Sequence, residues 1–447
     1  MNIKGALLLG SCFTALIISS PVLAQDASAD PVADAFSALS LTGGASVLAL
    51  PGMRTGVFTD GAGTFSPFSN PLGLGAQIGL SFGGTLGKTG DWDIISGLSL
   101  SAVIASANST TVDTFTGQGV VVIQSYSPGT ATFNLDTTRD GANASADSVI
   151  DITDTGANVA NATTGVTSVP AGTSAAFGVT PTAGDGFAFS GVTSSGGSTA
   201  AAYGATADTS GFTFIGVGDL EGLTVTTNAS ETVLMASGDI NIGVGGAADE
   251  STYLQAYIGP SARHIGRNID TSIAVDIPEV NATIFPEIGM NRSEELNGDY
   301  IGGLLGIGVS RFDETSGIVY SLTGEGGVYA YGFSYTGNET FNIAGNTVTS
   351  ATTVSEQSNG VAWLARAQAA MTLPMSGNST LTFAGSAEYL SRAPSITRAQ
   401  GPAVVINQAG NDYDADYTSV AGANANSHIS FGEMWSFGAT ASWTTSF

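Results

Sequence analysis

Acid–base chemistry has few candidates in this chain. His264 and His428 are the only histidines among 447 residues, so a histidine general base would have to be one of them. His264 closes the run Ser261-Ala262-Arg263-His264. Catalysis by a nucleophile requires a base and an orienting partner in fixed mutual geometry, and no motif around either histidine predicts such a set. We therefore expect that the protein is not an enzyme.

Metal binding has one candidate segment. Asp412, Asp414 and Asp416 alternate along the chain, and carboxylate oxygens are the ligands that Ca²⁺ prefers. The segment does not complete a calcium-loop pattern, because Tyr417 stands at the sixth position and Ala423 at the twelfth. A solvated acidic loop is the favoured interpretation, with Ca²⁺ as the alternative. We expect no other cofactor.

The composition limits the class of partner. Lys and Arg total 11 against 37 Asp and Glu, which gives a formal net charge of −26. Nucleic-acid binding needs clustered positive charge, so no nucleic-acid partner is expected. Gly, Ser, Thr and Ala are abundant, yet a hydrophobic fraction of 43% argues against wholesale disorder. The chain therefore has enough apolar sequence for an ordered fold.

The last seventeen residues alternate in character. Trp435, Phe437, Ala439, Ala441, Trp443, Thr445 and Phe447 share one face of a strand, and small polar residues such as Ser442 and Thr444 share the other. Because strand side chains alternate with a period of two, one face meets an apolar environment and the other a polar one. The strand also ends on an aromatic residue.

The first 24 residues have the features of a secretory signal peptide. Lys4 precedes an apolar stretch, and Val22-Leu23-Ala24 forms a cleavage site of small or short residues. A lipoprotein signal at Cys12 is the competing interpretation, although the hydrophobic sequence continues past it. Cys12 is the single cysteine, so the mature chain is expected to lack disulfides and thiolate metal sites.

The closing strand resembles that of Gram-negative outer-membrane β-barrels, in which a terminal aromatic residue serves as an assembly signal. The resemblance implies the cell outer membrane as location and assigns the signal to Trp443 and Phe447. It also implies contact with the barrel-assembly machinery, with outer-membrane lipid and with lipopolysaccharide. A secreted all-β adhesin is the alternative that composition alone leaves open.

Alternating segments elsewhere predict an all-β, antiparallel up-and-down barrel of about 12 strands, within a range of 10–16. A flexible segment at 25–36 is expected to precede the first barrel strands in 37–108, and the remaining strands lie in 231–447. The expected strands are 37–50, 73–86, 92–108, 231–244, 251–265, 279–290, 299–311, 314–322, 325–337, 360–373, 379–392 and 430–447.

Turn lengths assign the two ends of this barrel. Short connections at 87–91, 245–250 and 374–378 fall at the end that holds Phe447, as do 291–298 and the join at 323–324. Longer connections at 51–72, 338–359 and 393–429 fall at the opposite end. Short turns on the periplasmic side and long loops on the outer side are typical of outer-membrane barrels.

The interval 109–230 breaks the pattern. It is rich in Ser, Thr, Gly and Ala, and it is too long for an ordinary loop. We expect a polar, β-rich insertion on the outer surface, with strands near 120–123, 130–135 and 211–215. Additional barrel strands or an inward-folded constriction are the alternatives.

Large aromatic and basic residues suggest where the membrane lies. Trp92 and Trp443 fall near the periplasmic strand ends and Trp363 and Trp435 near the outer ends, as expected of aromatic girdles. Arginine binds phosphate in a bidentate manner, so arginines at the outer strand ends predict contact with lipopolysaccharide. The alternative is that charged groups collect there because the lipid face excludes them. These arginines are Arg263, Arg267, Arg311 and Arg392.

Inward-facing polar residues predict the lining of a lumen. Two of these residues are acidic and only Arg366 is basic, and many neighbouring residues in the strands are small. We therefore expect a porin-like passive channel with weak cation preference. The alternative is a surface-display, adhesion or structural protein whose barrel only anchors the outer region. The expected lining residues are Gln77, Asp239, Asn241, Arg366, Gln368 and Glu388.

Overall fold

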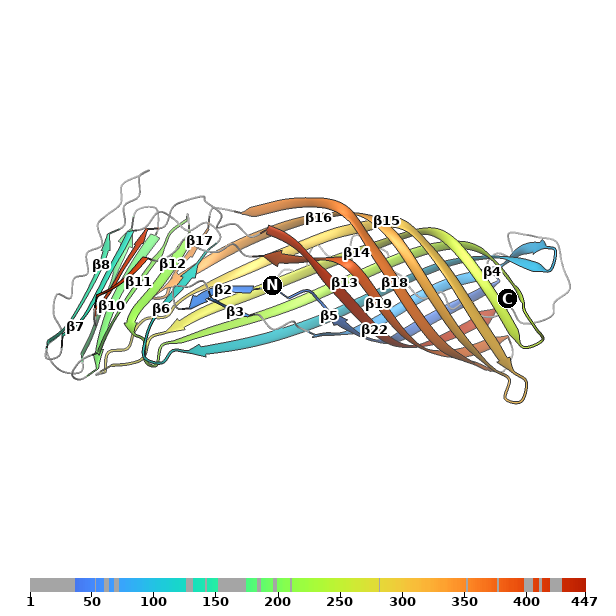
Figure 1. Cartoon of the computed structure of the whole chain (residues 1–447), viewed down its shortest axis with the longest axis horizontal. Coiled ribbons are helices and arrows are strands. Elements are labelled where there is room, and N and C mark those ends of the chain that lie inside the picture. Colours follow the sequence, from blue (N-terminus) through green and yellow to red (C-terminus); the bar gives the residue numbers. More distant parts are fainter. Residues whose placement is uncertain are drawn as a thin grey trace.

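The computed structural model describes most of the chain from residue 37 onward (Figure 1). The predicted segments 1–24 and 25–36 lie outside the described residues. Within the described part, no helix is both long and apolar enough to cross a bilayer. The described residues are 37–52, 54–59, 64–67, 72–125, 132–140, 143–151, 174–182, 186–195, 199–209, 211–280, 282–350, 353–375, 378–397, 405–409, 412–418 and 428–447.

The largest sheet is antiparallel and closes into a barrel. Its order of eleven strands is β15-β14-β13-β5-β4-β1-β22-β19-β18-β16-β17, and β15 also pairs with β16. Ten strands therefore form the ring, with β17 (Asn346–Thr349) paired to the edge of β16. The ring strands are β1 (Ala38–Ala49), β4 (Leu72–Thr89), β5 (Trp92–Thr114), β13 (Thr224–Ala247), β14 (Thr252–Asp276), β15 (Ile288–Asp313), β16 (Ile318–Ile343), β18 (Val354–Pro374), β19 (Ser379–Thr397) and β22 (His428–Ser446).

The ring confirms the predicted fold class, with ten strands in place of the expected twelve. The predicted strand at 279–290 is wrong: residues 277–287 connect β14 to β15, and Pro278 and Pro286 within them cannot donate to a strand ladder. The predicted strands 314–322 and 325–337 are one continuous strand, β16.

The two ends of the barrel differ as the turn lengths predicted. Tight turns at 90–91, 248–251 and 314–317 lie at the end that holds Phe447, where β18 also ends and β19 begins. We call this the Phe447 end. The turns predicted at 291–298 and 323–324 are wrong, because both segments lie inside strands. The long connections leave from the opposite end, which we call the head end.

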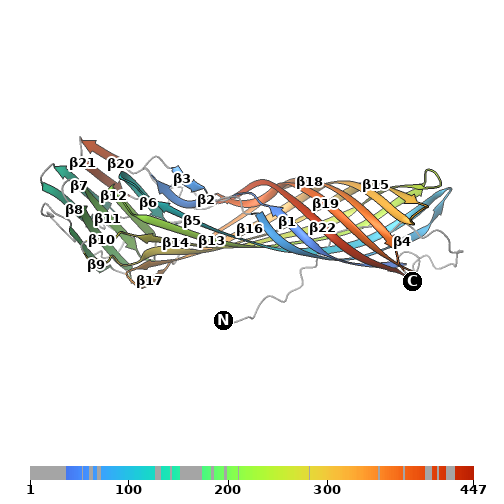
Figure 2. The ribbon, with the colours of Figure 1, turned by 90° about the horizontal axis from the view of Figure 1, so that it is seen from below.

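The insertion forms two further sheets at the head end, together with short strands from the connections 51–72 and 393–429 (Figure 2). A seven-stranded sheet has the order β3-β2-β6-β12-β11-β10-β9, and a four-stranded sheet has the order β20-β21-β7-β8. We call these two sheets the head. Its strands are β2 (Arg54–Thr59), β3 (Thr64–Pro67), β6 (Gln118–Gln124), β7 (Thr132–Asp140), β8 (Asn143–Asp151), β9 (Ser174–Thr182), β10 (Gly186–Ser195), β11 (Thr199–Ala207), β12 (Phe212–Asp219), β20 (Val405–Ala409) and β21 (Asp412–Thr418).

None of the described strands between residues 115 and 223 pairs into the ring, so the insertion adds no barrel strands. It begins after Thr114 and ends before Thr224, which pair with each other across β5 and β13. The expected boundaries of 109 and 230 therefore fell a few residues inside the barrel strands. The strands expected near 120–123 and 211–215 correspond to β6 and β12.

One hydrophobic core joins the head to the barrel. Val121, Phe189 and Phe214 of the head pack in the same cluster as Ile273 of β14 and Phe341 of β16. The connection after β14 contributes Phe285, whose ring lies 6.4 Å from that of Phe189 and 6.3 Å from that of Tyr203. The head is thus packed directly onto the extended ends of the barrel strands.

Candidate functional site

Five charged side chains meet inside the barrel, each from a different strand. Arg366 of β18 pairs with Glu325 of β16 and lies 3.5 Å from Asp239 of β13. Arg263 of β14 donates to both carboxylate oxygens of Glu388 of β19, at 2.9 and 3.0 Å. Arg366 also approaches Glu388, at 3.9 Å. We call these five residues the ionic cluster.

The ionic cluster carries a net negative charge, because three carboxylates face two guanidinium groups. Neutral groups complete it: the Tyr257 hydroxyl donates to Glu325 at 2.6 Å, and Ser261 donates to Asp239 at 2.5 Å. Arg263 keeps two buried nitrogens, Nε and Nη2, without a hydrogen-bond partner. A cavity of about 50 Å³ lies beside the cluster, which gives room for about one or two water molecules at these donors.

A hydrophobic layer crosses the barrel on the head side of the ionic cluster. Every ring strand except β4 contributes at least one buried side chain to it. Tyr300 lies at its centre, edge-on to Tyr329 with ring centroids 6.5 Å apart and to Phe333 at 5.2 Å. Close packing of rings and aliphatic groups leaves no room for a wide aqueous path at this level. The layer comprises Leu48, Val103, Ala105, Val233, Ile265, Tyr300, Leu304, Tyr329, Tyr331, Phe333, Ala362, Leu364, Leu390, Ala393 and Met434, with Leu50 after β1.

Inward-facing glycines make this packing feasible. A side chain at Gly327 would overlap the ring of Tyr329, and one at Gly298 would overlap the ring of Phe333. Gly306 is similarly placed against the ring of Tyr257. We expected small lumen residues to leave space for water, but these glycines leave space for aromatic rings.

Two further ion pairs lie toward the head. Arg267 is fully buried, donates to Glu231 at 2.5 Å and to the backbone carbonyl of Pro394 at 2.5 Å. Nearer the head, Arg292 donates to Glu339 at 2.6 Å. Unpaired charges are costly in such surroundings, so each arginine is matched by a carboxylate across neighbouring strands.

The residues predicted to line the lumen do face it. Asp239, Arg366 and Glu388 belong to the ionic cluster, and Gln77 and Gln368 line the small cavity beside it. Asn241 is buried on the inward face of β13. Sequence reasoning missed Arg263 and Glu325. Strand alternation could have identified both as inward-facing, because each lies an even number of residues from another inward-facing residue on its own strand.

The predicted contacts with lipopolysaccharide need correction. Arg263 and Arg267 point into the barrel and are buried in ion pairs, so they cannot reach lipid phosphates. Arg311 is exposed but lies near the Phe447 end, opposite the head, because β16 is one strand and the expected turn at 323–324 does not exist. Arg392 is exposed on the head side of β19 and stays a candidate.

The four tryptophans lie on the outer surface. Trp92 and Trp443 stand near the Phe447 end, while Trp363 and Trp435 lie farther along their strands toward the head. Phe447 is exposed, and its N–H donates to the carbonyl of Ser37 at 2.9 Å.

The candidate calcium ligands share one strand. Asp412, Asp414 and Asp416 alternate along β21, and their side chains lie outside the described residues. Among the described residues, no three His, Cys, Asp or Glu side chains converge as a metal site. On the outer face, Nδ1 of His264 lies 2.9 Å from Oδ1 of Asp299. Nδ1 of His428 lies 3.7 Å from Oε2 of Glu356.

An apolar band surrounds the part of the barrel nearer the Phe447 end. On β15 the exposed residues Ile301, Leu305 and Ile307 follow one another on the outward face, and β13 exposes Ile240 and Ile242. A strand segment such as 301–309 spans roughly 26 Å, or about 20 Å of depth at a typical tilt. The closed ring, the outward apolar band and the charged interior define a transmembrane β-barrel.

Comparisons with known proteins do not narrow the assignment beyond a transmembrane β-barrel. No protein-family model matches the sequence, and no curated protein matches it significantly. Among solved structures, the Pseudomonas putida toluene transporter TodX is 8% identical, with 92% of this chain and 90% of that chain covered and a TM-score of 0.16. The monoaromatic hydrocarbon channel CymD is 6% identical, with coverage of 92% and 89% and a TM-score of 0.16.

A Pseudomonas aeruginosa FadL homologue is 8% identical, with coverage of 92% and 90% and a TM-score of 0.16. Similarities this low carry no argument about transport. The assignment to transmembrane barrels rests on the strand pairing and surface of this chain.

Proposed function

We propose that this protein is an outer-membrane barrel that holds the head outside the cell, where the head serves in display or binding. The hydrophobic layer carries the proposal. Side chains from nine of the ten ring strands fill the cross-section, so the barrel is built as a solid support. The predicted secretory signal and the aromatic Phe447 of the last strand support the outer membrane as its location.

The shared core supports a rigid connection between the barrel and the head. The longest ring strands have 26 residues, which corresponds to roughly 85 Å of strand, whereas the apolar band of such barrels is about 25 Å tall. The excess length ends in the same core that contains Phe189 and Phe214 of the head. A head mounted in this way keeps a fixed distance from the membrane surface.

A gated passage for small polar solutes or ions is the second candidate. The small cavity beside the ionic cluster favours it, because polar residues of several strands line it. The cluster has three acidic and two basic members, so a passage through it would prefer cations weakly. On this proposal the hydrophobic layer must move before solutes cross.

Planar-bilayer recording separates the two candidates. The purified full-length protein should insert without stepwise conductance, because the layer blocks the lumen. A Tyr300→Ala/Tyr329→Ala variant, which removes two central rings, should raise the frequency of openings if it folds. Regular openings of the wild-type protein would overturn the support role and favour the passage. Heat-modified migration on gels would verify that both proteins are folded.

A further inference from the structure

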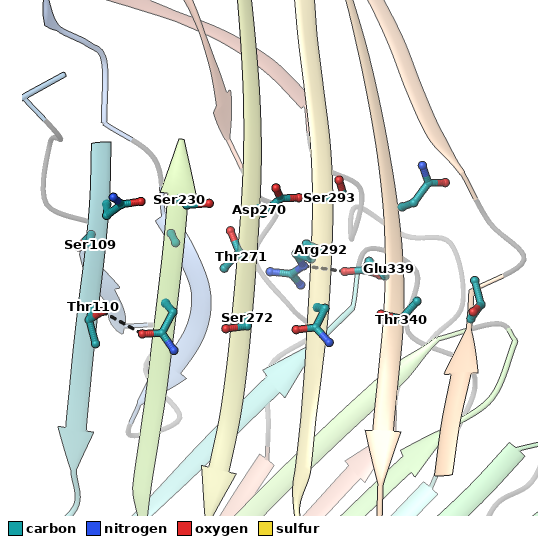
Figure 3. A pocket seen from close by; sticks show the side chains of 16 residues that line it. Ser109, Thr110, Ser230, Asp270, Thr271, Ser272, Arg292, Ser293, Glu339 and Thr340 are labelled. Carbon is teal, nitrogen blue, oxygen red and sulfur yellow. Dashed lines mark hydrogen bonds and ion pairs between the residues drawn. The ribbon is translucent and has the colours of Figure 1, made fainter. Parts of the chain in front are cut away.

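A groove of about 500 Å³ crosses the outer face of five barrel strands, between the apolar band and the head (Figure 3). Two rows of outward side chains form its walls, in register across β5, β13, β14, β15 and β16. Thr349 of β17 extends the second row. The first row is Asn108, Ser230, Asp270, Ser293 and Asn338, and the second is Thr110, Asn228, Ser272, Asn291 and Thr340.

The floor of the groove is rigid. Between the two rows lie residues whose side chains point inward and are buried, including Ala229, Thr271, Arg292 and Glu339. The Arg292–Glu339 pair therefore lies beneath the floor and faces away from the groove. Because the wall residues stand on paired strands, their relative positions are set by the sheet itself.

The chemistry of the walls is narrow. They offer amides, hydroxyls and a single carboxylate, Asp270, without an exposed lysine or arginine. A phosphate or sulfate would meet no cation here, and one carboxylate is too few for a metal ion. The Thr110 hydroxyl donates to Oδ1 of Asn228 at 2.9 Å, and the Asn228 side chain also carries an amide nitrogen that can donate to a ligand.

We propose that this groove binds a neutral oligosaccharide. Sugar hydroxyls are both donors and acceptors, and they match side-chain amides and hydroxyls that present both functions. Neighbouring strands are about 4.8 Å apart, a spacing comparable with the length of one hexose unit, so successive sugars can meet successive strands. Val112 is exposed two residues along β5 from Thr110, on the same face, and offers an apolar surface for the C–H face of a sugar ring.

The position of the groove agrees with this ligand. On β13 it begins four residues from Leu234, the last exposed apolar residue of the band toward the head, and on β5 four residues from Ile104. Four residues correspond to about 13 Å along a strand. The groove thus lies just above the apolar band, at the level of the sugars of surface glycolipids and within reach of soluble glycans.

Binding should be measured with the folded full-length protein in detergent micelles. One arm titrates neutral oligosaccharides of two to four hexose units, and the other adds lipopolysaccharide with its core sugars or lipid A without them. Binding of free oligosaccharides identifies soluble glycans as a source, whereas binding only to the sugar-bearing lipid identifies the glycolipid. Either result supports the proposal.

Groove variants make the test specific. Asn228→Ala/Asn291→Ala and Asp270→Ala should each weaken sugar binding by roughly five- to tenfold, the effect of losing one or two hydrogen bonds. Asn359→Ala is the matched control, since Asn359 is exposed on β18 outside the groove. Failure of every neutral sugar to bind, equal binding of lipid A, or unchanged binding by the groove variants would each overturn the proposal. The outcome is independent of conductance through the lumen.

Discussion

The two ends of strands β13, β14 and β15 expose opposite kinds of side chain. Toward the Phe447 end, β14 exposes Ile258 and buries Arg263. Toward the head, the same strand exposes Asp270 and buries Ile273. The strand keeps its period of two throughout, and its outward face changes from apolar to polar.

This change on the outward face marks where the surroundings change from lipid to water. In lipid, apolar side chains face outward and charges must be matched inside the barrel. In water, the apolar side chains turn to a core shared with the head. The outward face changes between Ile258 and Asn268 on β14 and between Ile301 and Ser293 on β15, so these two neighbouring strands share the boundary.

The largest effect is expected from breaking a buried ion pair close to this boundary. Arg267→Met leaves the Glu231 carboxylate buried without its cation, which should lower the free energy of unfolding by about 3–5 kcal/mol. The double variant Arg267→Met/Glu231→Leu should recover most of that loss. Urea unfolding in micelles, followed by tryptophan fluorescence, measures both. A single variant as stable as the wild type would show that the lumen is solvated there.

A charge on the outward face tests the boundary directly. Ile258→Lys places an ammonium group in the apolar band and should destabilise the barrel by about 2–4 kcal/mol. Ser272→Lys, on the same face of the same strand, should change stability by at most about 0.5 kcal/mol. Unfolding in lipid vesicles compares the two variants. Equal losses would mean that the boundary is misplaced.

The smallest effect concerns a turn at the Phe447 end. The pKa of Asp313 is lowered by hydrogen bonds from the Ser316 hydroxyl and the Thr315 N–H. A lowered folded pKa stabilises the protein above the unfolded value of about 3.9, and this stabilisation is lost as pH falls through the folded pKa. Asp313→Asn should therefore flatten the decline in stability slightly below about pH 4.

Ser316→Ala offers a check on this prediction, because it removes one of the two donors and keeps the carboxyl group. Its urea midpoint should fall slightly at neutral pH and converge with that of the wild type in acid. Identical pH profiles for wild type and both variants would exclude a contribution from this turn.

Sequence patterns predicted the strands of the apolar band well. In β18, alternation placed Trp363 outward and Arg366 inward, as the structure has them. Alternation could not reveal where the outward face turns from apolar to polar, because the strand keeps the same period there. The predicted boundary of the insertion at 230 fell inside β13 for this reason: residues such as Asn228 and Ser230 are polar but belong to a strand in water.

The filled lumen was beyond the reach of sequence reasoning. Glu231 and Arg267 lie 36 residues apart and meet only through the pairing of β13 with β14. Likewise, a glycine opposite an aromatic ring and a glycine beside water have the same sequence signature. The expected channel assumed that small inward-facing residues leave room for water, whereas the ring of Tyr329 occupies the space beside Gly327.

Ring closure has a consequence for the order of biogenesis. The barrel closes by pairing of its first and last strands, β1 with β22, so every head segment lies between them in the chain. Once the barrel has closed around the hydrophobic layer, no route through it is wide enough for a folded sheet. If the head lies outside the cell, as proposed, translocation of its strands must therefore precede the pairing of Ala38 with Ser446.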